Sequence, residues 1–360
     1  MRQFQSSLLL VPALILLSGS VVGCSGQGRT SDRPDATASG ADRSAPRGAA
    51  SIERSHRELK AVAVEILLGL SDDPSPEIRA NALEALQGHT ASLESVAALG
   101  LSDRSAGVRS VAAMVVGKQG LGELSPMLEG LAKDLSPFVR ASAMFALAKL
   151  RGAGVDVDLT PLSVMLLESE DIRVSSHAAF VLGELGNGSA IPLLQQAGGR
   201  QWGQTAPIRR QLFRLQIAEA MIKLGDVESM DAVRSALYPS RPEELEATAL
   251  AVQIIGEVRD RGAIDQLIYL VDENSDRPMP AEVRLAVAGA LAKLGLLEGG
   301  FIADEYSQNE NAVIRAQAAA VYGRTGQGEH LPKLEGMLLD DSAQVRAGSA
   351  GAILEILGTR

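Results

Sequence analysis

Cysteine is almost absent from this chain of 360 residues. The single cysteine, Cys24, lies near the N-terminus, so the sequence has neither a disulfide framework nor a set of thiolates that would hold a metal. The four histidines, His56, His89, His177 and His330, fall in four separate segments, and none has the spacing of a metal-binding pair. We therefore expect no metal site and no cofactor.

The motifs of common enzymes are also missing. No G-x-S-x-G elbow occurs, and four dispersed histidines leave little for a serine triad. The glycines of Gly183–Gly188 end a helical pattern instead of following a strand, which argues against a nucleotide-binding loop. Paired acids such as Glu243-Glu244 fall at expected helix starts, where helix capping accounts for them. We expect no catalytic residues and a protein that is not an enzyme.

Positive charge is scarce, with 34 Lys and Arg residues against 44 Asp and Glu residues and a net charge of −10. No run of five residues is basic, so the chain lacks the patch that a phosphate backbone would attract, and we expect no nucleic-acid partner. After the N-terminal segment, no stretch of 18 residues is apolar enough to cross a bilayer. Membrane attachment, if any, must come from the N-terminus.

What the chain has in abundance is a repeated phrase of 13 residues. It is clearest at Val283–Gly295 (VRLAVAGALAKLG), and it returns at Val108–Gly120, Val139–Arg151, Ile314–Gly326 and Val345–Leu357. Counted from position 0 at the first residue, apolar or small residues recur at positions 0, 4, 7, 8 and 11, which is the stripe of a helix with one buried face. Position 1 is usually Arg, and Gly often ends the phrase, as it ends many helices.

Alignment on this phrase gives nine copies, spaced 30 to 39 residues apart. A shorter apolar segment precedes each copy, and an acidic turn containing Pro or Ser separates the two. Such a period is typical of a solenoid, because one helix pair cannot bury its apolar face without neighbours. Position 1 of the nine copies is occupied in order by Arg79, Arg109, Arg140, Ser175, Arg214, Thr248, Arg284, Arg315 and Arg346.

From Leu59 to the C-terminus the chain resembles HEAT repeats of the short kind found in phycobilisome-lyase proteins. The resemblance rests on an Asp-Pro-type turn, then Val-Arg, then an Ala-rich helix that ends in Leu-Gly. It implies an all-α, right-handed α-solenoid, or superhelix, of about nine helix pairs over residues 51–360. Such repeats serve scaffolds, adaptors and a few enzymes alike, so the resemblance predicts the fold and not the activity. The His-Glu pairs of metal-dependent HEAT hydroxylases are absent.

The same resemblance implies a ladder of Asp and Arg side chains along the stack, made by position 1 and by the Asp five residues before each phrase. Ser175, Thr248 and Asn309 depart from the pattern, so we expect the ladder to be interrupted in the middle repeats. The residues assigned to the ladder are Asp73, Arg79, Asp103, Arg109, Asp134, Arg140, Arg284, Arg315, Asp340 and Arg346.

Residues 1–23 have the order of an export signal: Arg2, then an apolar core too short for a comfortable membrane span. Val21-Val22-Gly23-Cys24 resembles a bacterial lipobox, which implies cleavage after Gly23 and lipidation of Cys24; a chance cysteine beside a signal is the alternative. Residues 24–50 are then a lipid anchor and a disordered linker. This linker has no aliphatic residue larger than Ala and would span roughly 28 Å.

The localisation that follows is the cell envelope. By resemblance to the sorting pattern of bacteria with two membranes, Ser25, in place of Asp after the lipidated cysteine, implies the periplasmic side of the outer membrane. In a bacterium with one membrane, the same protein would lie on the outer face of the cytoplasmic membrane.

Position 6 of the phrase should face the inner groove of such a solenoid, because it points away from the apolar stripe. Three consecutive copies have Met114, Phe145 and Phe180 there, and Val111 and His177 lie beside them at position 3. This pattern predicts an exposed apolar strip that binds a partner. The alternative is that curvature or a neighbouring helix covers these side chains.

The middle repeats carry longer turns, and loops on rigid scaffolds often bind partners. Trp202, the only tryptophan, lies in one of these loops, and Tyr238 lies in the next. Both are candidate contact residues, and Arg209, Arg210, Tyr238 and Arg241 are expected near Trp202; neutral drift in loop length is the alternative. The alternating charges at position 10, such as Lys118 and Glu184, predict a solvated face with ion pairs between repeats.

Together these features predict an exported, lipid-anchored scaffold or adaptor that binds a protein or peptide of unknown identity at the cell envelope. A structural spacer without a specific partner is the first alternative. An enzyme similar to phycobilisome lyases is the second, and it fits poorly, because those lyases act in the cytoplasm and this chain has an export signal.

Overall fold

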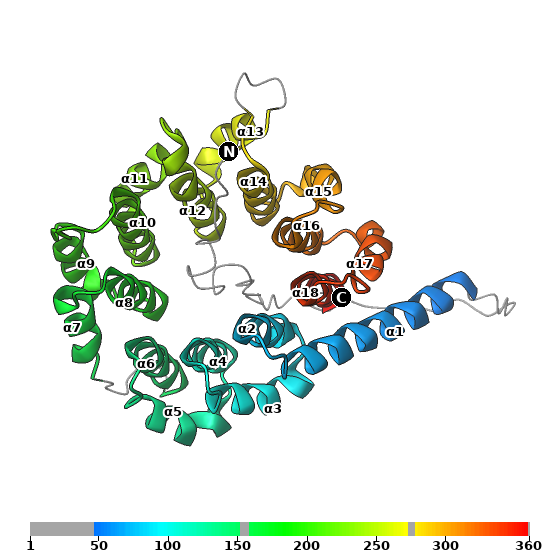
Figure 1. Cartoon of the computed structure of the whole chain (residues 1–360), viewed down its shortest axis with the longest axis horizontal. Helices are drawn as coiled ribbons and strands as arrows, with labels where there is room; N and C mark the ends of the chain where they lie inside the picture. Colours follow the sequence, from blue (N-terminus) through cyan, green and yellow to red (C-terminus); the bar gives the residue numbers. More distant parts are fainter. Residues whose placement is uncertain (1–46, 152–157, 273–277, 359–360) are drawn as a thin grey trace, which may run out of the picture.

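The computed structural model describes residues 47–151, 158–272 and 278–358, and these residues form nine helix pairs and no strand. In each pair one helix lies on the outside of the molecule and the other on the inside (Figure 1). The outer helices are α1 (Arg47–Leu70), α3 (Thr90–Leu101), α5 (Ser125–Leu131), α7 (Thr160–Glu168), α9 (Ile191–Gly198), α11 (Met230–Ser235), α13 (Ile264–Leu270), α15 (Gly300–Tyr306) and α17 (Leu331–Met337). The inner helices are α2 (Pro76–Ala85), α4 (Ala106–Gln119), α6 (Pro137–Arg151), α8 (Ile172–Leu185), α10 (Pro207–Lys223), α12 (Leu245–Glu257), α14 (Ala281–Lys293), α16 (Ala312–Thr325) and α18 (Ala343–Gly358).

Short 3₁₀ turns join most pairs to the next: η3 (Leu86–Gly88), η4 (Gly122–Leu124), η5 (Gly188–Ala190), η6 (Val227–Ser229), η8 (Arg261–Ala263), η9 (Leu297–Gly299) and η10 (Gly328–His330). One more, η7 (Pro242–Glu244), lies within a pair, between α11 and α12. The predicted all-α solenoid of about nine helix pairs is confirmed. The predicted signal peptide and Cys24 lie outside the described residues. The first helix begins at Arg47, four residues before the boundary at Ser51 that the sequence suggested.

The repeated phrase forms the inner helices, and its residue types explain their ends. Gly120 ends α4 and Gly186 ends α8 in the left-handed backbone region, with φ of 67° and 77°, which glycine adopts without steric cost. Asp171 and Asn311 cap α8 and α16, because each side chain accepts a hydrogen bond from a backbone N–H of the first turn. The helices therefore begin and end where the sequence pattern does.

The apolar stripe of the phrase makes the core. In α14, Val283, Val287, Ala290, Leu291 and Leu294, at positions 0, 4, 7, 8 and 11, are all buried. They pack between the outer helix of their own repeat and the inner helices of the neighbouring repeats. None of the helices in the described ranges is long and apolar enough to span a membrane.

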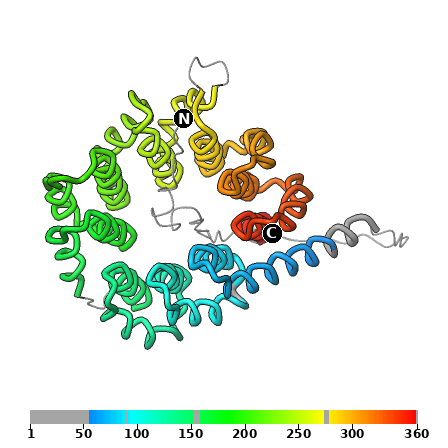
Figure 2. The backbone as a smooth tube through the Cα atoms, in the orientation of Figure 1, coloured from blue at the N-terminus to red at the C-terminus, as the bar shows by residue number. Residues whose placement is uncertain are grey.

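The nine pairs follow one another around a ring, and the ring closes (Figures 1 and 2). The last inner helix, α18, packs against α1, α2 and η3 at the start of the described chain. Gly351 of α18 and Ala85 of α2 are in van der Waals contact there, with 3.0 Å between the Ala85 Cβ and the place of a Cβ on Gly351. The repeat pattern alone gave no indication of this closure.

Candidate functional site

The expected apolar strip is not exposed. Met114, Phe145, Phe180, Val111 and His177 each expose less than 9% of their surface, and Met114 exposes none. The expectation that position 6 faces an open groove is therefore wrong for these residues.

The reason is the close packing of consecutive inner helices, which places position 6 between repeats. The ring of Phe145 lies against Gly117 of the preceding repeat, with its Cε1 2.9 Å from the place of a Cβ there. Lysine side chains cover what remains: Lys149 lies 5.7 Å from the centre of the Phe145 ring, and Lys223 lies 5.4 Å from that of Phe180. Long basic side chains thus shield the aromatic faces from water through their stems and through cation–π attraction.

A buried polar chain connects three repeats beside these rings. The hydroxyl oxygens of Ser110 and Ser142 are 2.8 Å apart, and Ser142 Oγ is 3.1 Å from His177 Nε2. Burial lowers the pKa of His177 to about 4, although a hydrogen bond with the Phe138 backbone opposes that shift. The imidazole is neutral at pH 7. Ser142 has the geometry of a nucleophile beside a base, but it has no exposed surface, so no substrate reaches it.

Charged side chains at position 10 of the phrase, together with Glu219 at position 6, form a belt on the inner helices, which we call the charged belt. Its members are Lys118, Glu184, Glu219, Lys223, Glu257 and Lys293. Glu184 joins repeats two, four and five, since its carboxylate lies 2.6 Å from Lys223 Nζ and 3.5 Å from Lys118 Nζ. Lys293 pairs with Glu257 of the preceding repeat at 2.6 Å. The ion pairs between repeats that the sequence predicted are present, although their side chains are more buried than a solvated face would be.

Burial and charge oppose each other in this belt. Burial by itself raises the pKa of Glu184, but the attraction of Lys223 and Lys118 outweighs it and the pKa of Glu184 is lowered. Burial by itself lowers the pKa of Lys223, but Glu219 and Glu184 outweigh it and the pKa of Lys223 is raised. Glu184 and Lys223 are therefore both charged at pH 7, and their ion pairs connect the repeats.

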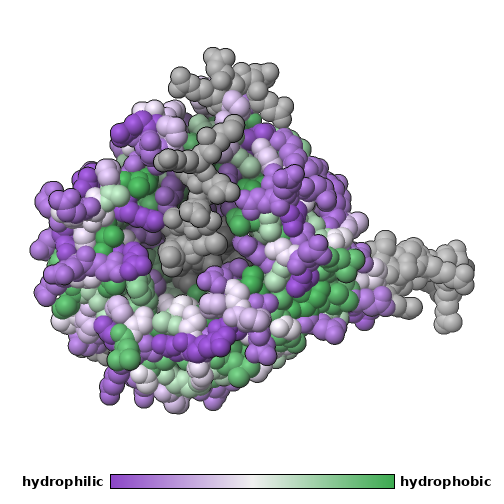
Figure 3. Space-filling view, viewed as in Figure 1, coloured by the Kyte–Doolittle hydropathy of each residue, from purple (hydrophilic) through white to green (hydrophobic). Residues whose placement is uncertain are grey.

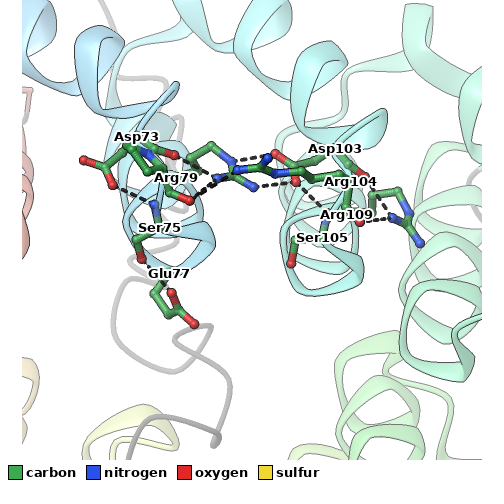
Figure 4. A network of polar contacts seen from close by, with 9 residues as sticks. Asp73, Ser75, Glu77, Arg79, Asp103, Arg104, Ser105 and Arg109 are labelled. Atoms are coloured by element: carbon green, nitrogen blue, oxygen red, sulfur yellow. Dashed lines mark hydrogen bonds and ion pairs between the residues drawn. The ribbon is translucent and has the colours of Figure 1, made fainter.

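The Asp and Arg ladder is present near both ends of the repeat array. Arg79 donates from Nε and Nη2 to the two carboxylate oxygens of Asp103 in the next repeat, both at 2.7 Å, and from Nη1 to the carbonyl of Asp73 at 2.8 Å (Figure 4). Asp103 also accepts from the backbone N–H of Ser105 at 2.7 Å. Arg109 pairs with Asp134, and Arg315 with Asp340, in the same two-pronged way.

These arginines hold the pKa of Asp103, Asp134 and Asp340 below the usual range of a carboxyl group. Each unit therefore binds the turn of its own repeat and the turn of the next one, so it sets the angle between successive helix pairs.

The ladder changes in the middle repeats, as the sequence predicted. Where Ser175 replaces the arginine, Arg200 of the next repeat reaches back to the carbonyls of Leu166 and Ser169, each at 2.8 Å. Thr248 donates to the carbonyl of Ala236. Arg140 and Arg346 bind only the carbonyls of their own turns, and Arg284 pairs with Glu305 instead of an Asp.

The two loop candidates differ in exposure. Trp202 is half-buried: its ring meets the edge of Phe213 with 5.2 Å between centroids, and the Arg200 guanidinium lies 4.2 Å over it. These contacts show that Trp202 packs within its own chain, so its ring is not free to insert into a partner. Tyr238 is 59% exposed. Arg210 donates to the carbonyls of Gly203 and Thr205 in the loop of Trp202, as expected, whereas Arg209 lies near Glu246.

The outer rim of three consecutive repeats carries exposed aromatic residues, of which the sequence singled out Tyr238 alone. Tyr269 of α13 is 63% exposed and Phe301 of α15 is 53% exposed, and Tyr238 follows α11 in the preceding repeat. These three are the aromatic residues with more than a third of their surface exposed in the described part of the chain. We call Tyr238, Tyr269 and Phe301 the aromatic rim. The outer helices are short and vary in sequence, so no periodic pattern marked it.

Within the described ranges, no three His, Cys, Asp or Glu side chains come together in a way that would hold a metal ion. The family comparison matches residues 63–148 to HEAT repeats. Residues 63–148 are therefore similar to HEAT repeats. This fold is the scaffold type that protein-interaction repeats use. The comparison with curated proteins finds no match.

Solved structures with related folds include human deoxyhypusine hydroxylase in complex with glycerol, at 18% identity and a TM-score of 0.35, over 78% of this chain and 99% of that one. They include the complex of CpcE and CpcF of phycocyanin lyase from Nostoc, at 18% identity and a TM-score of 0.30, over 67% of this chain and 80% of that one. An engineered protein matches at 17% identity with a TM-score of 0.32, over 87% of this chain and 97% of that one. At these scores the likenesses say nothing about activity.

Proposed function

We propose that this protein is an exported, lipid-anchored scaffold without catalytic activity, which binds a protein partner through the aromatic rim. The observation that carries the proposal is the occurrence of exposed aromatic residues on α13 and α15 and directly after α11, three consecutive outer helices, in a chain with only 3% aromatic residues. Large aromatic side chains are enriched in the cores of protein interfaces and are costly to leave in water.

The other surfaces support this assignment by contrast. The inner helices expose no apolar strip at position 6, and their charged belt is paired within the chain. Large apolar residues elsewhere on the rim, such as Leu99 of α3, occur without an aromatic neighbour in the adjoining repeats. A partner that buries the aromatic rim would contact three repeats. Because the ring already fixes the relative positions of these repeats, binding would cost little conformational entropy.

Site-specific photo-crosslinking in the native envelope tests the surface. A photoreactive residue at Tyr269 or Phe301 should give one discrete adduct. The same residue at Leu99, which is 71% exposed on α3 across the ring, should give none (Figure 1). An adduct of equal yield from Leu99 would refute the assignment of the rim.

A pull-down of the lipidated protein should agree. The triple variant Tyr238→Ser/Tyr269→Ser/Phe301→Ser should lose the crosslinked partner, and Leu99→Ser should retain it. Equal recovery by the triple variant would move the contact to another face. The absence of any specific partner in all samples would favour a structural spacer.

The lipid anchor is tested separately, by substitution of Cys24. Wild-type protein should incorporate a radiolabelled fatty acid and fractionate with membranes, and Cys24→Ala should do neither. If Cys24→Ala still incorporated the label and fractionated with membranes, the anchor would not be at Cys24. This experiment does not depend on the aromatic rim, so the two parts of the proposal fail independently.

A further inference from the structure

The joint that closes the ring differs from the joints within it. At four other joints, a glycine at position 9 of one inner helix lies against an alanine at position 7 of the next: Gly117 with Ala146, Gly183 with Ala220, Gly256 with Ala290, and Gly323 with Ala352. At the closing joint, Gly351 at position 6 of α18 lies against Ala85 at position 7 of α2. Register does not set this joint apart, because the same one-residue offset occurs within the array, where Gly348 at position 3 of α18 lies against Ala316 at position 2 of α16.

What sets the joint apart is that no chain segment connects its two repeats and that they form no ladder pair. Arg346 of α18 occupies the position from which Arg79, Arg109 and Arg315 reach the next repeat. It donates instead to the carbonyls of Asp340 and Asp341 in its own turn, at 2.7 and 3.0 Å. Asp73, its expected acceptor, accepts from the backbone N–H of Ser75. Arg346 and Asp73 do not pair.

Helix α1 compensates for this difference. It has 24 residues, twice the 12 of the next longest outer helix, α3. It packs against α18 as well as α2, and its Ala63, Leu67 and Leu70 are buried. Figure 3 shows apolar surface gathered where α1 leaves the ring. The closing joint thus depends on apolar packing by one long helix, in place of a bidentate ion pair such as those of Arg79, Arg109 and Arg315.

We propose that the α18–α2 joint is a gate through which the ring opens, and that α1 is its latch. Release of α1 from α18 separates the two ends, leaves the joints between the other inner helices intact, and converts the ring into an open solenoid. Repeat proteins allow this because each repeat contacts only its neighbours, so one joint opens without unfolding the others. The gate is independent of the aromatic rim, which lies on repeats six to eight.

A pair of engineered disulfides tests the proposal in a Cys24→Ser background, which has no other cysteine. Gly88→Cys/Leu354→Cys staples the closing joint, because the two Cβ positions are 3.9 Å apart. Ala316→Cys/Gly348→Cys staples the ordinary α16–α18 joint, with Cβ positions 3.7 Å apart. Both spacings suit a disulfide. The measurement is amide hydrogen exchange by mass spectrometry, helix by helix.

Both staples should form. The closing staple should slow exchange in α1, α2 and α18 by at least about tenfold and leave α8 to α12 unchanged, and the control staple should leave α1 and α2 unchanged. Failure of the closing staple under conditions where the control staple forms would refute ring closure. A closing staple that forms but changes no exchange rate would refute the gate.

The latch is tested by Leu67→Ala, which removes a fully buried side chain of α1, beside Leu128→Ala, which removes one from the outer helix α5. Leu67→Ala should raise exchange in α18, far along the chain, and Leu128→Ala should not. The closing staple should restore protection of α18 in Leu67→Ala. If both variants affected α18 equally, α1 would not be a latch.

Discussion

The Cα of Ala146 lies 2.7 Å from the place that a Cβ on Gly117 would occupy. The backbones of α4 and α6 are therefore in direct contact. The same contact recurs between Gly183 and Ala220, and between Gly323 and Ala352, at 2.8 Å in each case. A glycine–alanine contact thus sets the spacing of alternate inner helices and contributes to the tight curvature of the ring.

Gly117→Ala should destabilise the protein by about 1–3 kcal/mol, because the added methyl group forces two helix backbones apart. This loss exceeds the gain of about 0.5–1 kcal/mol that replacement of a helical glycine by alanine normally brings. Urea denaturation followed by circular dichroism measures the difference.

The matched control is Gly130→Ala in α5, where an added Cβ meets nothing within 4 Å. Its stability should stay the same or rise by up to about 1 kcal/mol. Equal losses in Gly117→Ala and Gly130→Ala would show that the contact with Ala146 is not what matters.

The ion pair of Arg79 and Asp103 should couple strongly in a double-mutant cycle. Their side chains are 8% and 13% exposed and form two parallel hydrogen bonds, so we expect a coupling energy of about 1.5–3 kcal/mol from the Arg79→Ala and Asp103→Ala variants. The Arg173–Asp171 pair, at 63% and 37% exposure, should couple by about 0–1 kcal/mol. Similar coupling in both cycles would contradict a structural role for the ladder.

The sequence predicted what depends on one repeat and its immediate neighbour. The apolar stripe of the phrase located the inner helices, and the fixed offset between position 1 and the preceding Asp anticipated the pairing of Arg79 with Asp103. Ser175 and Thr248 correctly marked two repeats without that pairing, but Arg140, which keeps the arginine, binds only its own turn. Each of these features follows from residues a fixed distance apart in the chain.

The exposure of position 6 was not predictable in the same way. A helical wheel shows that Phe145 points away from the stripe, but it does not show that Gly117 of the preceding helix approaches closely enough to cover it. Ring closure is even harder to predict from the sequence, because it depends on the sum of the small rotations between successive repeats. No single residue determines that sum, and Gly351 gave no sign that it would contact Ala85.

Glu84 should make the protein less stable as the pH rises. Its side chain is buried on α2, and burial, which outweighs the attraction of Lys118, raises its pKa to about 8 from an ordinary 4.5. Between these two values the folded protein holds a proton that the unfolded chain has lost. The stability from this group is therefore complete below about pH 4.5 and is lost as the pH rises to about 8.

Glu84→Gln removes this dependence and keeps the shape of the side chain. Relative to wild type, the variant should gain about 2–4 kcal/mol of stability between about pH 4.5 and pH 9, measured by denaturation at each pH. If the two proteins changed in parallel over that range, the carboxyl group would be ionised in the folded state and the prediction would be wrong.

His177 should make the protein less stable as the pH falls, which is opposite to the effect of Glu84. Burial lowers its pKa to about 4 from 6.5, so between these values the unfolded chain binds a proton that the folded protein does not. Stability from this group is present above about pH 6.5 and is lost as the pH falls to about 4. His177→Gln keeps a hydrogen-bonding group near Ser142 but does not titrate, so its loss of stability between about pH 7.5 and pH 4.5 should be smaller than that of wild type by about 1–3 kcal/mol. Denaturation of both proteins at the two pH values measures this difference, and equal losses would mean that the imidazole is protonated inside the fold.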